Sequence, residues 1–240
     1  MKVLCVIPAR FASTRLPGKP LREIGGVPMI CRVYERAREA RLVDRTIVAT
    51  DDERILSAVK NYGGEAVITD KNHPTGTDRL AEVAAKFDGY GLIINVQGDE
   101  PLIDPGLIDE LAAAFRDDNL QMATVAVPIA ADERENPNNV KVVMDREGFA
   151  LYFSRSLIPY PRRENMVEVY KHVGIYAYRR EFLLKFAKWS PTPLEQAESL
   201  EQLRALENGC RIKVIKTDHK FIGVDTEEDL RLVNEIYGEA

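Results

Sequence analysis

The sequence predicts an α/β fold built on an open, mostly parallel sheet, with a smaller antiparallel addition in its second half. Three observations lead to this prediction. Apolar runs of strand length alternate with segments of helical periodicity through the first half of the chain. The first of these runs, VLCVIP at residues 3–8, is apolar throughout, which is typical of a strand covered on both faces. Over about residues 121–180, short strand-like runs follow one another at close spacing.

Local patterns predict the remaining elements of the first half. Apolar residues after Pro28 recur at helical spacing, and proline is favoured in a first helical turn, so a helix is expected there. Further apolar runs predict three strands, at residues 46–50, 66–69 and 92–99. Capping and turn residues predict three more helix starts, near Asp52, at Thr77 or Asp78, and at Asp104.

The second half changes character and then returns to the α/β style. Strands are expected in MATVAVPI, VKVVMD, ALYFS and HVGIYAYR. One long helix is predicted from about Pro193 to Glu207, followed by a strand at 212–217 and a final helix from Thr226. Because no linker or repeat interrupts the chain, we expect one domain over residues 1–240, in which about 121–210 form an elaborated half.

Composition excludes several classes of protein. Apolar residues make up 45% and charged residues 30% of the chain, as in an ordinary soluble globule. A net charge of −5 argues against broad nucleic-acid binding, and the absence of a long apolar run argues against a membrane span. The N-terminus has no cleavage-site pattern, so no signal peptide is expected. Three cysteines without CxxC spacing favour buried inert thiols over a metal site or nucleophile, and fit a reducing cytoplasm: Cys5, Cys31 and Cys210.

A cationic loop follows the first predicted strand. IPARFASTRLPGKPL at residues 7–21 carries Arg10, Arg15 and Lys19 on a proline-restricted backbone. Ligands of open α/β sheets bind beyond the carboxyl ends of the strands, and forked guanidinium groups with an ammonium suit a polyanion such as a triphosphate. A solvated surface loop is the alternative. Neither GxxxxGK[ST] nor GxGxxG occurs here, so a kinase-like P-loop and a dinucleotide fold lose support.

Two aspartates follow predicted strands far apart in the chain. Asp99 ends LIINVQGD, and Asp225 lies in GVDT before the final helix. An aspartate at a strand end is also common as a turn or cap residue. A pair of such carboxylates facing a triphosphate loop would suit Mg²⁺, which takes one or two carboxylates and completes its shell with phosphate and water. The sequence does not show whether the two are adjacent.

These motifs together resemble the 3-deoxy-manno-octulosonate cytidylyltransferase family. The cationic loop followed by GGVPMI matches its N-terminal signature, and the resemblance continues in order through nearly the whole chain, in VATDDERI, HPTGTDRLAEV, INVQGDEP, ALYFSRSLIPY, KHVGIYAYR, PLEQAESLEQLR and GVDTEEDL. The sialic-acid cytidylyltransferases share a looser version of the first loop. The resemblance implies a nucleotidyltransferase (Rossmann-like) fold and a cytoplasmic enzyme that forms CMP-Kdo and pyrophosphate from CTP and 3-deoxy-manno-octulosonate (Kdo) for lipopolysaccharide assembly.

The resemblance also assigns roles at the nucleotide. It implies Mg²⁺ held by Asp99 and Asp225, and a triphosphate bound by Arg10, Ser13, Arg15 and Lys19. Asp99, Lys19, Arg10 and Asp225 would be the catalytic residues. Metal coordination lowers the pKa of a bound hydroxyl, so attack of the anomeric hydroxyl of the sugar on the α-phosphorus needs no dedicated base.

The resemblance implies a second set of side chains around the sugar: Arg79, Gln97, Arg155, His172, Tyr176, Glu201 and Gln202. The residues alone leave alternatives open, since Arg79 could face solvent, Arg155 could serve a subunit contact and Glu201 could form an internal salt bridge. His172 and Tyr176 are four apart in a strand-like run and should share one face.

The expected partners are therefore CTP and Kdo, with a homodimer formed in part by ALYFSRSLIPYP. Two other functions stay open. One is the same chemistry on another 2-keto acid sugar, of the 8-amino-Kdo or sialic-acid type. The other is a non-catalytic nucleotide-binding subunit.

Overall fold

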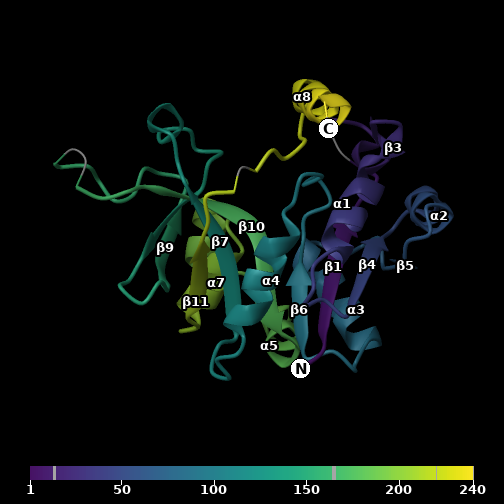
Figure 1. The fold of residues 1–240 in the computed structure, drawn as a ribbon. Coiled ribbons are helices and arrows are strands. Elements are labelled where there is room, and N and C mark those ends of the chain that lie inside the picture. The colour runs from purple at the N-terminus through teal and green to yellow at the C-terminus, as the bar shows by residue number, and fades with distance from the viewer. Residues whose placement is uncertain (13–14, 164–165, 220, 240) are drawn as a thin grey trace.

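The computed structural model describes residues 1–12, 15–163, 166–219 and 221–239, and it is built on one nine-stranded sheet (Figure 1). The strand order is β11-β7-β10-β6-β1-β4-β5, with β8 beside β10 and β9 beside β8. The bounds are β1 Val3–Ala9, β4 Arg45–Thr50, β5 Ala66–Ile68, β6 Leu92–Asn95, β7 Met122–Pro128, β8 Lys141–Met144, β9 Ala150–Ser154, β10 Tyr170–Arg179 and β11 Ile212–Lys216. The predicted α/β fold with a mostly parallel sheet is confirmed.

Helices cover the sheet, and a small hairpin precedes the first of them. The helices are α1 Met29–Arg38, α2 Glu53–Asn61, α3 Gly76–Lys86, α4 Pro105–Ala114, α5 Arg180–Phe186, α6 Pro193–Glu198, α7 Gln202–Glu207 and α8 Glu227–Glu239. The hairpin pairs β2 (Glu23–Ile24) with β3 (Val27–Pro28). None of the helices among the described residues is long and apolar enough to cross a membrane.

The first strand shows why an uninterrupted apolar run is stable here. Strand β1 pairs in parallel with β4 on one side and β6 on the other. Its alternate residues enter two different apolar cores, Cys5 and Ile7 on one face of the sheet and Leu4 and Val6 on the other. Burying a side chain of this size stabilises the fold by roughly 1.5–3 kcal/mol, so both faces favour apolar residues.

The antiparallel addition continues the same sheet. Strand β10 pairs antiparallel with β6, β7 and β8, while β11 returns to a parallel pairing with β7. The elaborated half is therefore joined edge to edge with the nucleotide half, and β10 lies directly beside β6, the strand that leads to Asp99.

Three local predictions are wrong. The long helix expected from Pro193 to Glu207 is broken at Ser199, which has a left-handed backbone (φ 52°), so that α6 and α7 are separate. The cap of α3 is Thr75, which forms a capping box with Asp78, instead of Thr77 or Asp78. Strand β6 ends at Asn95, so the segment up to Asp99 is loop.

The C-terminal segment crosses from one half of the molecule to the other. Helix α8, which follows the loop of residues 221–226, lies beside β2 and β3 (Figure 1). There, a third apolar cluster joins the cationic loop, the start of α1 and the C-terminal segment: Leu16, Ile24, Met29, Val224, Leu230 and Val233. This crossing carries Asp225 to the carboxyl end of β1.

Candidate active site

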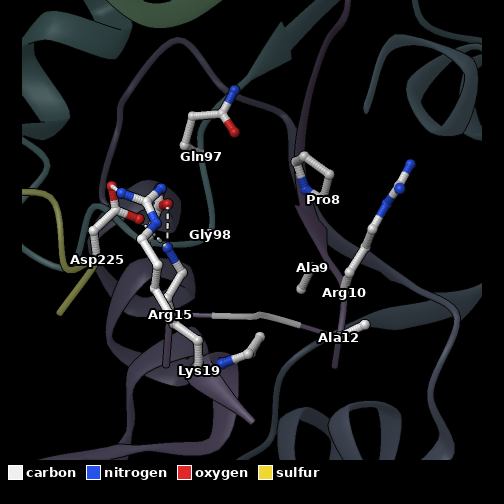
Figure 2. A pocket seen from close by; sticks show the side chains of 11 residues that line it. Pro8, Ala9, Arg10, Ala12, Arg15, Lys19, Gln97, Gly98 and Asp225 are labelled. Carbon is white, nitrogen blue, oxygen red and sulfur yellow. Dashed lines mark hydrogen bonds and ion pairs between the residues drawn. The ribbon is translucent and has the colours of Figure 1, made fainter. Parts of the chain in front are cut away.

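Both predicted metal-binding aspartates meet the cationic loop at one point. The Nζ atom of Lys19 lies 2.7 Å from Oδ2 of Asp99 and 2.9 Å from Oδ1 of Asp225. Nη1 of Arg15 lies 3.1 Å from Oδ2 of Asp225 (Figure 2). The convergence on which the catalytic hypothesis depends is therefore present, although Lys19 and Asp225 are 206 positions apart in the chain.

Main-chain contacts hold the two aspartate segments together. The amide of Val224 donates a hydrogen bond to the carbonyl of Asp99 over 2.9 Å. A Cβ at Gly98 would lie 2.8 Å from the carbonyl oxygen of Pro8, so only glycine lets this loop approach the end of β1 so closely. Lys19 begins a short 3₁₀ turn whose N-cap, Gly18, is in the left-handed region at φ 66°.

These residues surround a cavity of about 340 Å³ at the carboxyl ends of β1 and β6 (Figure 2). It is lined by Pro8, Ala9, Arg10, Ala12, Arg15, Lys19, Pro20, Gln97, Gly98, Asp99 and Asp225. This is the position at which ligands bind in open α/β sheets.

Burial and neighbouring charges shift the pKa values of two side chains at or next to the cavity, Lys19 and Glu100. Burial lowers the pKa of Lys19, but Asp99 and Asp225 outweigh it and the pKa is raised, so the ammonium stays charged. Glu100, which the sequence reasoning did not single out, has a pKa raised to about 8 by burial and then by the negative charge of Asp99. The sequence feature that could have pointed to Glu100 is its position directly after Asp99.

Arg10 lies across the cavity from Lys19, and it is tied to another loop (Figure 2). Its Nη2 donates a hydrogen bond to the carbonyl of His73 over 2.8 Å. The structure thus joins the cationic loop to the HPTG loop. Ser13, predicted to bind the triphosphate, lies outside the described residues.

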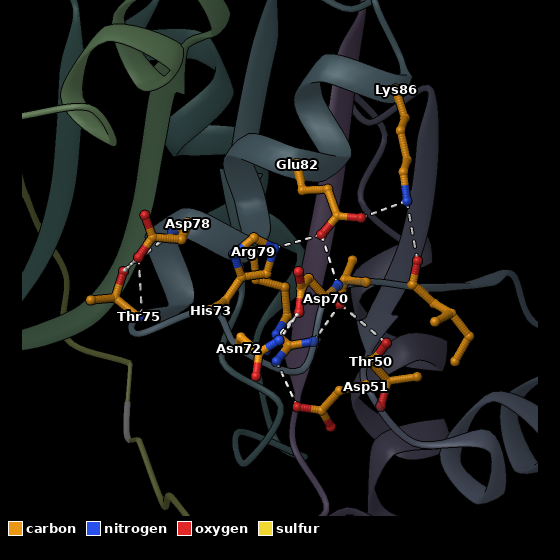
Figure 3. Close-up of polar contacts among 12 residues, drawn as sticks. Thr50, Asp51, Asp70, Asn72, His73, Thr75, Asp78, Arg79, Glu82 and Lys86 are labelled. Atoms are coloured by element: carbon orange, nitrogen blue, oxygen red, sulfur yellow. Dashed lines mark hydrogen bonds and ion pairs between the residues drawn. The ribbon is translucent and has the colours of Figure 1, made fainter.

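The HPTG loop is anchored by Glu82 of α3 (Figure 3). The Glu82 carboxylate accepts hydrogen bonds from the amide of Asp70 (2.9 Å) and from Nζ of Lys86 (2.6 Å), and Nε2 of His73 lies 2.5 Å away. Burial alone would raise the pKa of Glu82, but these partners lower it to about 2. The loop that contacts Arg10 is therefore fixed by a charged carboxylate.

Arg79 does not occupy the position expected for a sugar ligand. Its side chain is fully buried; Nη2 donates to Oδ2 of Asp51 over 2.7 Å, and Nη1 donates to the hydroxyl of Thr69 (Figure 3). The expectation that Arg79 reaches into the crevice is corrected, because a buried arginine needs a carboxylate partner and finds it in Asp51.

Gln97 connects the nucleotide cavity with β10. It lines the cavity, and its Nε2 donates to the carbonyl of Gly174 over 2.9 Å. Gly174 lies between His172 and Tyr176, whose rings are in contact with centroids 5.3 Å apart. The ring of Tyr176 therefore packs on that of His172, although a register shift interrupts the strand between Val173 and Tyr176.

His172 is held as a neutral imidazole. Its Nε2 lies 2.9 Å from the hydroxyl of Thr124, and its ring packs edge-on against Phe153 at 5.0 Å. Burial lowers the pKa of His172 to about 3. Such a ring can exchange hydrogen bonds with a hydroxyl, but it carries no charge at neutral pH.

Glu201 and Gln202 lie at the start of α7 with unused hydrogen-bonding capacity. One oxygen of Glu201 accepts from the hydroxyl of Thr77, while Oε1 of Glu201 and Nε2 of Gln202 are buried and have no hydrogen-bond partner among the described residues. Burial raises the pKa of Glu201. The internal salt bridge that the sequence left open as an alternative is weak, since Nη2 of Arg204 is 3.9 Å from Glu201 and pairs at 2.5 Å with Glu195. Unmade buried hydrogen bonds are costly, so these atoms favour a polar ligand.

Arg155 forms hydrogen bonds with two main-chain segments of the elaborated half. Its Nε donates to the carbonyl of Glu198 over 2.7 Å and its Nη1 to the carbonyl of Pro137 over 3.0 Å. The guanidinium is thus engaged by main-chain groups, and its predicted role at the sugar stays a prediction.

Comparisons with known proteins agree with this site. The cytidylyltransferase family model matches residues 4–217. A 3-deoxy-manno-octulosonate cytidylyltransferase of Fusobacterium nucleatum is 54% identical over 235 residues, covering 97% of this chain and 96% of the relative. That of Geobacter sulfurreducens is 53% identical, covering 98% and 99%.

Solved structures show the same relationship. A CMP:2-keto-3-deoxy-manno-octonic acid synthetase complexed with CTP superposes with a TM-score of 0.96 at 46% identity, covering 100% of this chain and 99% of that one. A putative glucose-1-phosphate thymidylyltransferase of Bacillus anthracis, 15% identical with a TM-score of 0.71, shares the fold. The chain therefore belongs to the 3-deoxy-manno-octulosonate cytidylyltransferase family, as its sequence motifs predict.

Proposed function

We propose that this enzyme forms CMP-Kdo and pyrophosphate from CTP and Kdo, for lipopolysaccharide assembly in the cytoplasm. The observation that carries the proposal is the meeting of Lys19, Asp99 and Asp225 in one cavity at the carboxyl end of the parallel sheet. Its support is the family, in which the relatives are named for this sugar and one solved structure is a complex with CTP.

In this reaction the anomeric hydroxyl of Kdo gives up its proton to solvent, and its oxygen forms a bond to the α-phosphorus of CTP while the bond from that phosphorus to the oxygen bridging to the β-phosphate breaks. Pyrophosphate leaves with the negative charge of that bond. Arg10, Arg15 and Lys19, which all line the cavity, would bind the β- and γ-phosphates and offset this charge, since charge-assisted hydrogen bonds are the strong ones. On binding of the triphosphate, the Lys19 ammonium would exchange the carboxylates for phosphate oxygens.

Asp99 and Asp225 fit a magnesium ion. Both present hard carboxylate oxygens, and both already approach one cationic group, Lys19. Within the described ranges no group of three or more histidine, cysteine or acidic residues could hold a metal alone, so two carboxylates with phosphate and water are the expected ligand set. When bound, Mg²⁺ lowers the pKa of a coordinated hydroxyl and offsets phosphate charge.

The sugar would lie beside β10 and α7. Glu201, Gln202, His172 and Tyr176 present a carboxylate, an amide, an imidazole and a phenol, which suit a polyhydroxylated ligand. Glu201 and Gln202 have buried polar atoms without a hydrogen-bond partner in the described part of the chain. Hydroxyl groups of the sugar would serve as these missing partners. Gln97 links this wall to the nucleotide cavity.

The elaborated half would also form a two-fold contact with a second copy of the chain. Large apolar side chains are exposed on β9 and the following loop, among them Leu151 (62%) and Tyr160 (84%). Both belong to the ALYFSRSLIPYP segment predicted to form the homodimer. A surface of this kind is typical of a protein interface.

Pyrophosphate release tests the function directly. Purified enzyme is supplied with Mg²⁺, one of the four ribonucleoside triphosphates, and Kdo, 8-amino-Kdo or a sialic acid. CTP with Kdo should give the highest kcat/KM, and Asp99→Asn and Asp225→Asn should each lose several orders of magnitude. Asp132→Asn, on an exposed turn, is the matched control.

Two outcomes would contradict the proposal. A higher kcat/KM with another acid sugar would assign the same chemistry to that sugar. Nucleotide binding without pyrophosphate release under any condition would show a non-catalytic nucleotide-binding protein.

A further inference from the structure

The C-terminal helix α8 contacts each of the three segments that carry the active site. These are the cationic loop with its hairpin, the loop that contains Asp99, and the loop that contains Asp225. The helix itself lies outside the cavity and contributes none of the residues that line it. Its contacts are therefore candidates for a positioning role.

The first turn of α8 fixes the backbone of Asp225. The carboxylate of Asp229 accepts hydrogen bonds from the amide of Asp225 (3.0 Å) and from the amide and hydroxyl of Thr226 (2.8 and 2.9 Å). The amide of Asp229 donates back to the hydroxyl of Thr226 over 3.2 Å. This reciprocal capping box holds Asp225 at the residue just before the cap, where a change in backbone direction would move its carboxylate.

The last turns of α8 contact the other two segments. The hydroxyl of Tyr237 donates to the carbonyl of Pro101 over 2.9 Å, two residues after Asp99. Asn234 accepts from the amide of Gly25 (2.9 Å) and donates to the carbonyl of Glu23 (3.1 Å).

The start of α8 also carries a paired charge. Nη1 and Nη2 of Arg22 donate hydrogen bonds to the two carboxylate oxygens of Glu227, over 2.7 and 2.8 Å. One helix thus contacts the segments that carry Lys19, Asp99 and Asp225.

We propose that α8 is a positioning element of the active site, in which Asp229 sets the orientation of Asp225 and Tyr237 sets that of the Asp99 loop. The inference rests on the proposed function, because it assigns α8 a task in the same reaction. It goes further in placing part of the metal and phosphate geometry under the control of residues that touch neither substrate. Groups that orient metal ligands in this way typically change metal affinity or activity by about 10- to 100-fold when removed.

The test compares Asp229→Ala with Asp229→Asn, which retains an acceptor oxygen, and with Glu228→Ala. Glu228 is the matched control because it is an exposed acidic residue in the same turn, and no contact with the Asp225 segment is described for it. Two readouts are measured: the Mg²⁺ concentration for half-maximal pyrophosphate release, and the Kd of Mn²⁺ by electron paramagnetic resonance without substrates.

We expect both quantities to rise about 10-fold or more in Asp229→Ala, with the KM for Kdo unchanged. Asp229→Asn should have values of both quantities near those of the wild type, and Glu228→Ala should have the wild-type values. Wild-type values in Asp229→Ala would overturn the inference. If the wild-type enzyme released no pyrophosphate, the proposed function would fail, while the Mn²⁺ titration would still decide the positioning role.

A second variant covers the case in which Asp229→Ala does not fold. Tyr237→Phe removes one hydroxyl and leaves the ring over Arg32 in place. The loss of a single hydrogen bond corresponds to about a 2- to 10-fold rise in the Mg²⁺ requirement. An unchanged Mg²⁺ requirement in this variant would contradict the inference.

Discussion

Replacing Lys19 by methionine tests the dual role of its ammonium group. In the structure, Nζ lies 2.7 Å from Asp99 and 2.9 Å from Asp225, and the Lys19 side chain is only 16% exposed. Methionine keeps much of the apolar stem but removes the charge. Two effects of opposite sign are expected, one on the nucleotide and one on the metal.

The effect on CTP follows from the lost phosphate contact. A hydrogen bond to a charged group contributes about 1.5–3 kcal/mol, which corresponds to about a 10- to 150-fold rise in the KM for CTP. The affinity for the metal ion should instead increase, because Asp99 and Asp225 then face each other without a cation between them. Their side chains are 34% and 45% exposed, so solvent screening limits this repulsion to about 1 kcal/mol.

The assay is steady-state pyrophosphate release at varied CTP, together with thermal unfolding with and without Mg²⁺. Lys60→Met, an exposed lysine in the last turn of α2, controls for the loss of one positive charge. Lys19→Met should show the raised KM and a larger stabilisation by Mg²⁺ than the wild type. A KM for CTP within about twofold of the wild-type value would refute the assigned contact.

Four further predictions concern the residues at the proposed sugar site, the HPTG loop (residues 73–76) and the subunit contact. Glu201→Gln should raise the KM for Kdo about 10-fold or more and leave the KM for CTP unchanged in the same assay, because the charged acceptor for sugar hydroxyls is lost; an unchanged KM for Kdo would remove Glu201 from the site. His172 should remain neutral at pH 5 in an NMR titration, since its pKa is lowered to about 3, and an imidazolium signal at that pH would contradict this lowered pKa. Glu82 has a pKa lowered from 4.5 to about 2, so its stabilisation is present above pH 4.5 and is lost as the pH falls toward 2. Allowing for partial exposure, Glu82→Gln should cost about 1–2 kcal/mol in urea unfolding at pH 7 and little at pH 2, and an equal cost at both would count against the ion network. Leu151→Glu should give a monomer by light scattering at a concentration at which the wild type is a dimer, and a wild-type monomer would refute the contact.

Strands that are covered on both faces could be predicted well from the sequence. VLCVIP becomes β1 because each of its side chains enters one of two cores, and that environment leaves an uninterrupted apolar pattern. The break between α6 and α7 could not be predicted, since apolar spacing continues across Ser199 and the left-handed residue is not a glycine. What stabilises the break is tertiary: Arg204 folds back onto Glu195 through two hydrogen bonds of 2.7 and 2.5 Å.

The candidate site also contains residues that could be selected from the sequence and one whose position could not be predicted. Arg15, Lys19, Asp99 and Asp225 could be selected because each follows a predicted strand or lies in a loop where α/β ligands bind. Arg79 could not be placed, because its partner Asp51 lies 28 positions earlier and only the folded chain brings the two together.

The proposed reaction requires a nucleoside triphosphate and a metal ion to meet between the Asp99 and Asp225 segments. The most direct measurement is a crystal structure with CTP and Mn²⁺, in which anomalous scattering locates the metal. We expect a manganese peak bonded to carboxylate oxygens of Asp99 and Asp225 and to the α-phosphate, with Lys19 on the β- or γ-phosphate. A nucleotide bound in another cavity, or manganese held without both aspartates, would contradict it.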